Sequence, residues 1–243
     1  MPPRLGGGAV DRSLPLSGLR RVSERQVAAT VPEPSDLSFD PSTGSFWTVS
    51  DQTGALYRIN SDGSAAGSPL QIHGTDLEGV AFDPKTGHVF VADEARREVA
   101  EITRDGEVVG RIPVPGKNAD NSGLEGIAAD PETGGFVLVN ERDPAQLVFI
   151  DRAGKQIGLA KVQTEDLSAV TFAPGGKTLL VVGRFEEAVL EVDRMGRTLN
   201  RLSLGAPGIE GIAFDDRGRL VAVADLGANS RGKIYMFARG NEQ

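Results

Sequence analysis

The sequence predicts an all-β fold, a five-bladed β-propeller with four-stranded blades. One segment pattern occurs five times, at residues 34–51, 77–94, 124–141, 167–184 and 209–226. Equivalent positions in successive segments are 43, 47, 43 and 42 residues apart, which is close to the length of one propeller blade. The 31 glycines and 14 prolines are spread along all 243 residues, as a protein of many short strands and turns requires.

Each segment contains two short apolar runs with a turn between them. In the segment 77–94 these runs are residues 79–82 and 89–92, and the intervening DPKTG favours an antiparallel hairpin. We expect these runs to be the two inner strands of a blade. A third alternating run, such as 99–102, ends at a glycine turn in the first four blades, and a fourth run, such as 107–112, completes the blade.

The fifth segment has no fourth strand, because the chain ends soon after its third run at 234–237. A spare run of similar pattern lies before the first segment, at 23–31. We expect this N-terminal strand to complete the fifth blade and close the ring, since closure hides the strand edges that an open sheet exposes. A sixth, degenerate blade within residues 1–33 is the alternative, but those residues lack the hairpin pattern.

The expected domain boundaries follow from this closure. They are a flexible leader at 1–22, the propeller at 23–238 and a C-terminal tail at 239–243.

Composition and charge exclude several classes of function. The chain carries 26 Lys and Arg against 34 Asp and Glu, a net charge of -8, which repels a nucleic-acid backbone. The absence of cysteine excludes disulfides, thiolate nucleophiles and cysteine-ligated metals. No apolar run is long enough to span a membrane or to serve as a secretory signal, so the sequence as written predicts a soluble protein, which would be cytoplasmic if its N-terminus is complete. Without any coiled-coil pattern, we expect a monomer.

Oxygen-bearing side chains recur at the same two places of the repeat. The start of the first strand holds glutamate in three segments: Glu78, Glu125 and Glu210. Because the first strand is innermost in a propeller, these carboxylates face one mouth of the central channel. Antiparallel pairing brings the end of the second strand to the same mouth, with Asp93, Asn140 and Asp225. Additional rim ligands are Asp51, Glu94, Glu141 and Ser35.

Carboxylates that converge on one axis repel each other, so either their pKa values are raised or a cation balances them. A ligand set made of oxygen alone favours Ca²⁺, with Mg²⁺ or Mn²⁺ less favoured. The sequence therefore predicts a calcium site at this mouth. The fourth segment departs from the pattern, so we expect the ion to lie toward the second, third and fifth. The departing residues are Ser168, Gly183 and Arg184. The alternative is that the glutamates are solvated rim charges.

The runs DLEGVAFDPKTGHVFVADE, GLEGIAADPETGGFVLVNERDPAQL and GIEGIAFDDRGRLVAVAD resemble the SdiA-regulated family of bacterial proteins, distant relatives of NHL-repeat propellers. The resemblance covers about residues 30–238, and NERDPAQL is its most distinctive part. It implies a five-bladed propeller with bound calcium and no established biochemical activity. It also implies a place in the periplasm or cell envelope, although this sequence shows no leader that would direct export.

Three functions fit these observations. The first is a non-catalytic calcium-binding module that presents its rim to an unidentified protein or small ligand. We expect Arg142, Arg96 and Arg97 beside this rim to form local ion pairs, with contact to an anion as the alternative. The second is a metal-dependent hydrolase of the lactonase type, in which the metal polarises a carbonyl and His73 is a candidate general base. The third is a scaffold without metal. No G-x-S-x-G motif supports serine-type hydrolysis, and we assign no catalytic residue.

Overall fold

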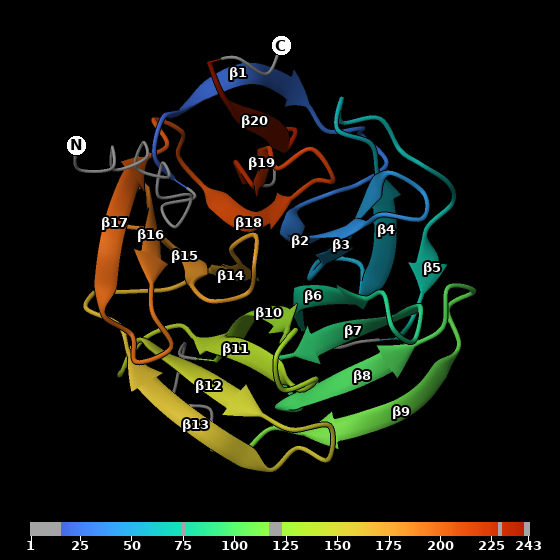
Figure 1. Cartoon of the computed structure of the whole chain (residues 1–243). Helices are drawn as coiled ribbons and strands as arrows, with labels where there is room; N and C mark the ends of the chain where they lie inside the picture. The colour runs from blue at the N-terminus through green and yellow to red at the C-terminus, as the bar shows by residue number, and fades with distance from the viewer. Residues whose placement is uncertain (1–15, 74–75, 117–122, 228–229, 241–243) are drawn as a thin grey trace, which may run out of the picture.

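The computed structural model describes residues 16–73, 76–116, 123–227 and 230–240. Twenty strands in these ranges form five four-stranded sheets around a central axis, with every pair of neighbouring strands antiparallel (Figure 1). The predicted five-bladed, all-β propeller is confirmed. The described ranges hold no helix, and so none that would be long and apolar enough to cross a membrane.

The blades are numbered 1 to 5 in the order of the repeats, and each is given from its innermost strand outward. Blade 1 holds β2 (Pro34–Asp40), β3 (Ser45–Ser50), β4 (Ala55–Ile59) and β5 (Leu70–Gln71). Blade 2 holds β6 (Leu77–Asp83), β7 (His88–Asp93), β8 (Glu98–Ile102) and β9 (Val108–Pro113). Blade 3 holds β10 (Leu124–Ala129), β11 (Phe136–Asn140), β12 (Gln146–Ile150) and β13 (Gln156–Lys161).

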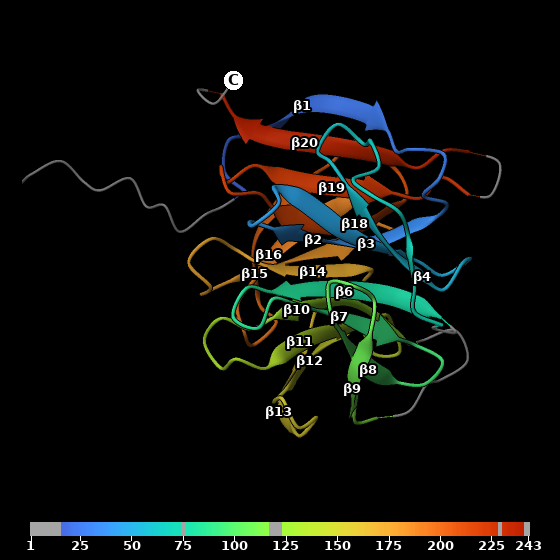
Figure 2. The ribbon, with the colours of Figure 1, turned by 90° about the vertical axis from the view of Figure 1, so that its right-hand side faces the viewer.

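Blade 4 holds β14 (Ala169–Phe172), β15 (Leu179–Gly183), β16 (Ala188–Val192) and β17 (Thr198–Ser203). Blade 5 holds β18 (Ile209–Phe214), β19 (Leu220–Ala224), β20 (Lys233–Arg239) and the N-terminal strand β1 (Leu19–Gln26). Figure 2 shows the ring edge-on, with the strands running between its two faces. We call the face that carries the first-to-second-strand hairpins the hairpin face, and the opposite end of the channel the acidic mouth.

The strand β1 closes the ring by pairing antiparallel with β20, as the sequence predicts. Its predicted bounds, 23–31, were wrong: the strand runs from Leu19 to Gln26. As the outer edge of blade 5, β1 is mostly exposed and carries no apolar alternation that would reveal its register. The apolar residues that suggested a longer strand, Val27 and Val31, lie after its end, in a buried cluster that joins blades 5 and 1.

The revised bounds also change the expected ends of the domain. Residues 19–22, assigned to the leader from the sequence, belong to β1, and Arg239, assigned to the tail, ends β20. The remainder of the expected leader and tail lies outside the described residues, apart from residues 16–18 and 240.

Ion pairs join neighbouring blades at the hairpin face. In each, the aspartate that follows or ends the first strand of one blade meets an arginine from the turn between the third and fourth strands of the next. The pairs are Asp40 with Arg104, Asp83 with Arg152 and Asp130 with Arg194. Each arginine also lies over a phenylalanine ring; Arg194, for example, is 5.1 Å from the centre of Phe172. The turn glycines were predicted from the sequence, but the inter-blade role of these arginines was not.

The innermost strands approach one another too closely at the axis for a side chain on every strand. A Cβ atom added to Gly79 would lie 2.4 Å from the carbonyl oxygen of Glu125, and one added to Gly126 would lie 2.7 Å from the Cα atom of Ala169. The glycine that follows each channel glutamate is therefore required by backbone packing.

Blade 1 carries Asp36 where blades 2, 3 and 5 carry this glycine. Asp36 is fully buried and has a φ of 54°. Its Oδ1 accepts a hydrogen bond from the N–H of Leu37 at 2.8 Å, and its Oδ2 accepts from Val80 at 3.0 Å and from Ile127 at 3.2 Å. Because these amides belong to blades 1, 2 and 3, the carboxyl group lies at the centre of the ring.

Candidate metal centre

Bulges in the inner strands aim the channel glutamates at the acidic mouth. The ladder between β6 and β7 skips Glu78, and the ladder between β18 and β19 skips Glu210. In blade 3 the ladder between β10 and β11 is interrupted between Leu124 and Ile127, which includes Glu125. A bulge leaves its extra residue outside the regular pairing and re-aims that side chain. Each of the three glutamates is the second residue of its strand, at the end opposite the first-to-second-strand hairpin.

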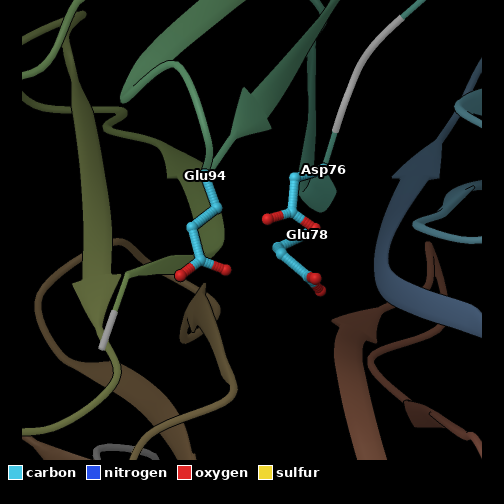
Figure 3. A group of neighbouring side chains, drawn as sticks. All are labelled: Asp76, Glu78 and Glu94. Carbon is cyan, nitrogen blue, oxygen red and sulfur yellow. The ribbon is translucent and has the colours of Figure 1, made fainter. Parts of the chain in front are cut away.

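The side chains of Asp76, Glu78 and Glu94 lie near one another on the blade 2 side of the mouth (Figure 3). Each offers one oxygen, and these oxygens all lie within 4.8 Å of one another. Two oxygens bound to one Ca²⁺ at its usual distances are at most about 5 Å apart, so this spacing fits a single cation. A 2.8 Å hydrogen bond from the N–H of Glu94 to the carbonyl oxygen of Asp76 fixes the backbone on both sides of the group.

The electrostatics of this group favour a positive ion. Burial raises the pKa of Glu78 to about 9, with a further contribution from the carboxylates around it. Burial and neighbouring carboxylates also raise the pKa of Glu94 to about 7, against the opposite effect of two nearby arginines. The pKa of Asp76 is raised for the same reasons. A bound cation would relieve this cost by stabilising the ionised forms.

The other half of the mouth receives a cation from the protein itself. The Nη2 atom of Arg184 lies 3.4 Å from Glu210. Burial raises the pKa of Glu125 well above its usual value and that of Glu210 to about 7, while Arg184 acts in the opposite direction on both. Arg184 therefore balances the half of the mouth that blades 3 and 5 form, and a metal ion bound at the blade 2 side would balance the other half.

Three other predicted ligands make local hydrogen bonds that hold the loops of the rim. Asp93 accepts from the backbone N–H of Arg96 and pairs with its guanidinium at 2.8 Å. Asn140 donates to the carbonyl oxygens of Arg142 and Pro144. Asp225 accepts from the N–H of Gly227 at 3.0 Å. Neither aspartate belongs to the group within 4.8 Å among the described residues, so as ligands these side chains remain a prediction.

The additional rim residues occupy distinct surroundings. Glu141 is buried and forms a two-pronged ion pair with Arg142, at 2.8 and 3.1 Å. The predicted anion contact Arg142 thus already has an acidic partner. Asp51 is exposed, accepts from the N–H of Gln52 and raises the pKa of Glu78 by its charge. Ser35 is buried, and its carbonyl oxygen accepts from the hydroxyl of Thr48.

Asp76 was not predicted as a ligand from the sequence. This residue lies in the loop just before the aligned segment of blade 2, and Gly123 and Gly208 hold the same place in blades 3 and 5. Blades 1 and 4 carry an acidic residue at this position, Glu33 and Asp166. This partial recurrence is the one feature of the repeat that indicated a role for Asp76. The candidate base His73 is exposed, with a φ of 52°.

In metal-free protein, the free energy of unfolding is expected to fall as pH rises from about 5 to 7. The pKa of Glu210 in the folded protein is about 7, against an ordinary value of 4.5, so the folded state keeps a proton that the unfolded state releases. The contribution of Glu210 to the free energy of unfolding is fully present below its pKa in the unfolded chain. Above that pH the contribution decreases by about 1.4 kcal/mol per pH unit, until the pH passes the pKa in the folded protein. Glu94 acts in the same direction, but less because it is partly exposed.

Thermal melts in EDTA at pH 5, 6, 7 and 8 measure this dependence. The variant Glu210→Gln has no titrating group at this position and should show a flatter profile. A midpoint that rises steadily from pH 5 to 8 in the wild type would contradict the assignment.

A model of the SdiA-regulated family matches residues 16–225. The chain belongs to the SdiA-regulated family. This match confirms the resemblance seen in the repeat segments, and the extent of the family model includes every residue of the acidic mouth named above.

Solved structures similar to this SdiA-regulated protein are distant in sequence. The hydrazine synthase of Kuenenia stuttgartiensis has a TM-score of 0.55 at 14% identity; the match covers 82% of this chain but only 57% of that one. A chain of a nidogen/laminin complex has a TM-score of 0.60 at 17% identity, covering 80% and 73%. The β-propeller domain of Cps50 (Swd1) from Myceliophteria thermophila has a TM-score of 0.50 at 11% identity, covering 85% and 65%. These likenesses show the fold alone.

Proposed function

We propose that this SdiA-regulated protein is a calcium-binding module, and that Asp76, Glu78 and Glu94 hold the ion at the acidic mouth. The observation that carries the proposal is the approach of three carboxylate oxygens to within 4.8 Å in partly buried surroundings. The donors are hard oxygens alone, which suits Ca²⁺ and, less well, Mg²⁺ or Mn²⁺. Their separation also matches what one ion requires.

The same site supports recognition of a ligand. Ca²⁺ takes six to eight oxygen ligands, and when bound here it supplies positive charge and coordination positions beyond those that three side chains fill. Asp76, Glu78 and Glu94 hold the ion at the rim, where an oxygen of a protein or small molecule can complete the shell. We propose a non-catalytic role for this module. Of the candidate bases, His73 is exposed and His88 pairs with Glu101 at 2.7 Å.

Adding Ca²⁺ to metal-stripped protein is expected to raise its thermal midpoint by roughly 5 to 10 °C at 100 times the Kd. This follows from a stabilisation of about 2.7 kcal/mol and a shift of about 2 to 4 °C per kcal/mol in a domain of this size. Differential scanning calorimetry with Ca²⁺, Mg²⁺ and Mn²⁺ measures the response. A larger rise with Ca²⁺ than with the other ions supports the choice of metal.

The variants Glu78→Gln and Glu94→Gln should lose the calcium response while remaining as stable as the metal-free wild type at pH 8, because glutamine resembles the uncharged form that burial favours at both positions. The matched control is Glu107→Gln, which changes an exposed acid in the turn between β8 and β9. That variant should respond as the wild type does. An unchanged midpoint in wild-type protein, or a response that survives both mouth variants, would overturn the proposal.

A further inference from the structure

A cavity of about 360 Å³ opens at the hairpin face, at the end of the channel opposite the acidic mouth. Phenylalanines that end or nearly end the first strands of four blades line it: Phe39, Phe82, Phe172 and Phe214. The equivalent residue in blade 3 is Ala129, which also lines the cavity. Residues of all five blades line the cavity, and Ala129 leaves more room on the blade 3 side than a phenylalanine would.

Small residues make this space available. Ala128 and Ala129 are adjacent in β10, and both line the cavity on the blade 3 side. On the blade 1 side, Ser38 accepts a 2.8 Å hydrogen bond from the N–H of Phe82, which leaves its own hydroxyl proton for another acceptor. The volume is within the range of small-molecule sites, which begins at about 300 Å³.

The charges around the cavity leave one cation unmatched. Of the acidic residues that line it, Asp83 pairs with Arg152 and Asp130 pairs with Arg194. Lys85 also lines the cavity, and in the described part of the chain its ammonium group has no ion pair or hydrogen bond. A ligand with one negative charge would complement this lining.

We propose that the cavity binds a small aromatic carboxylate. The ring of the ligand takes the place that Ala129 leaves open and packs against the four phenylalanines, as aromatic pairs do in offset or edge-to-face contact. The carboxylate accepts from the hydroxyl of Ser38 and faces the ammonium of Lys85. This site is on the opposite face from the proposed calcium site and stands independently of it.

The probe for this site is 3-phenylpropionate. Its control ligand is 3-phenylpropionamide, which has the same ring and chain but no charge. Binding is measured by saturation-transfer NMR and by titration of amide chemical shifts. We expect saturable binding of the carboxylate and about two- to fivefold weaker binding of the amide, since an exposed charge pair contributes up to about 1 kcal/mol. The variant Lys85→Gln should lose that preference, whereas Lys177→Gln, in the equivalent hairpin of blade 4 but outside the cavity, should keep it.

The variant Ala129→Phe supplies the missing ring and should reduce binding at least tenfold without lowering the thermal midpoint. Ala129→Leu projects a smaller side chain from the same position and provides the test if the first variant misfolds. Glu78→Gln, on the other face, should bind the probe as the wild type does. The proposal is overturned if the wild type shows no saturable binding, if both filling variants still bind, or if the amide binds as tightly as the carboxylate.

Discussion

Replacing Asp36 with alanine is expected to lower the free energy of unfolding by at least about 3 kcal/mol, because three buried amides lose their acceptor and each unpaired amide costs about 1 to 3 kcal/mol. These amides belong to Leu37, Val80 and Ile127 in three different blades. The carboxyl group thus joins blades that the sheet ladders do not connect. Urea unfolding followed by circular dichroism measures the change.

Two further variants separate the lost hydrogen bonds from the unusual backbone. Asp36→Asn keeps one acceptor oxygen for Val80 and Ile127 and should be less harmful than alanine. Asp36→Gly matches blades 2, 3 and 5 and suits the φ of 54°, so it should be more stable than alanine but less stable than the wild type. If alanine were as stable as the wild type, the central carboxyl would have no role in holding the ring.

The architecture was predictable because the inner strands are buried on both sides and repeat in phase. At one second-strand position the residues of blades 1 to 4 are large or branched and fully buried, as expected of a layer between blades: Trp47, Phe90, Val137 and Leu180. The bounds of β1 were not predictable in the same way. Its side chains face solvent, so any register of the strand buries nearly the same surface.

The candidate site was predictable only in part. Glu78, Glu125 and Glu210 share one position of the repeat, and that shared phase places them at one mouth. The grouping of Asp76 with Glu78 and Glu94 depends on a loop outside the repeat, and the pairing of Glu210 with Arg184 depends on the direction of a long side chain. Neither follows from strand periodicity.

The central carboxyl and the inter-blade arginines were missed for a related reason. Asp36 stands in a glycine position, which marks it as exceptional, but its partners are backbone amides that leave no trace in the sequence. The arginines precede turn glycines whose positive φ already accounts for the turn. The local sequence of these turns therefore gave no indication that their arginines also pair with aspartates of the preceding blade.

Replacing Arg194 with methionine is expected to cost about 3 to 5 kcal/mol, because it leaves a buried carboxylate without its counter-charge. Arg194 donates two hydrogen bonds of 2.7 Å to Asp130, whose side chain is 1% exposed. Adding Asp130→Asn should restore part of the loss, since the double variant buries no unpaired charge. The control is Arg197→Met in the same turn: Arg197 is 79% exposed, so breaking its pair with Asp193 should cost at most about 1 kcal/mol.

The pH dependence provides a second test of the same pair. Burial alone raises the pKa of Asp130, but hydrogen bonds from Arg194 and from the N–H of Glu132 outweigh it and lower that pKa to about 2. The stabilisation by ionised Asp130 is therefore fully present above its pKa in the unfolded chain, about 4. It disappears as the pH falls through the lower pKa of Asp130 in the folded protein. In urea unfolding at several pH values, the difference between wild type and Asp130→Asn should be constant above pH 5 and shrink toward pH 2. A difference that stays constant down to pH 2 would mean that the charge of Asp130 does not hold blades 3 and 4 together.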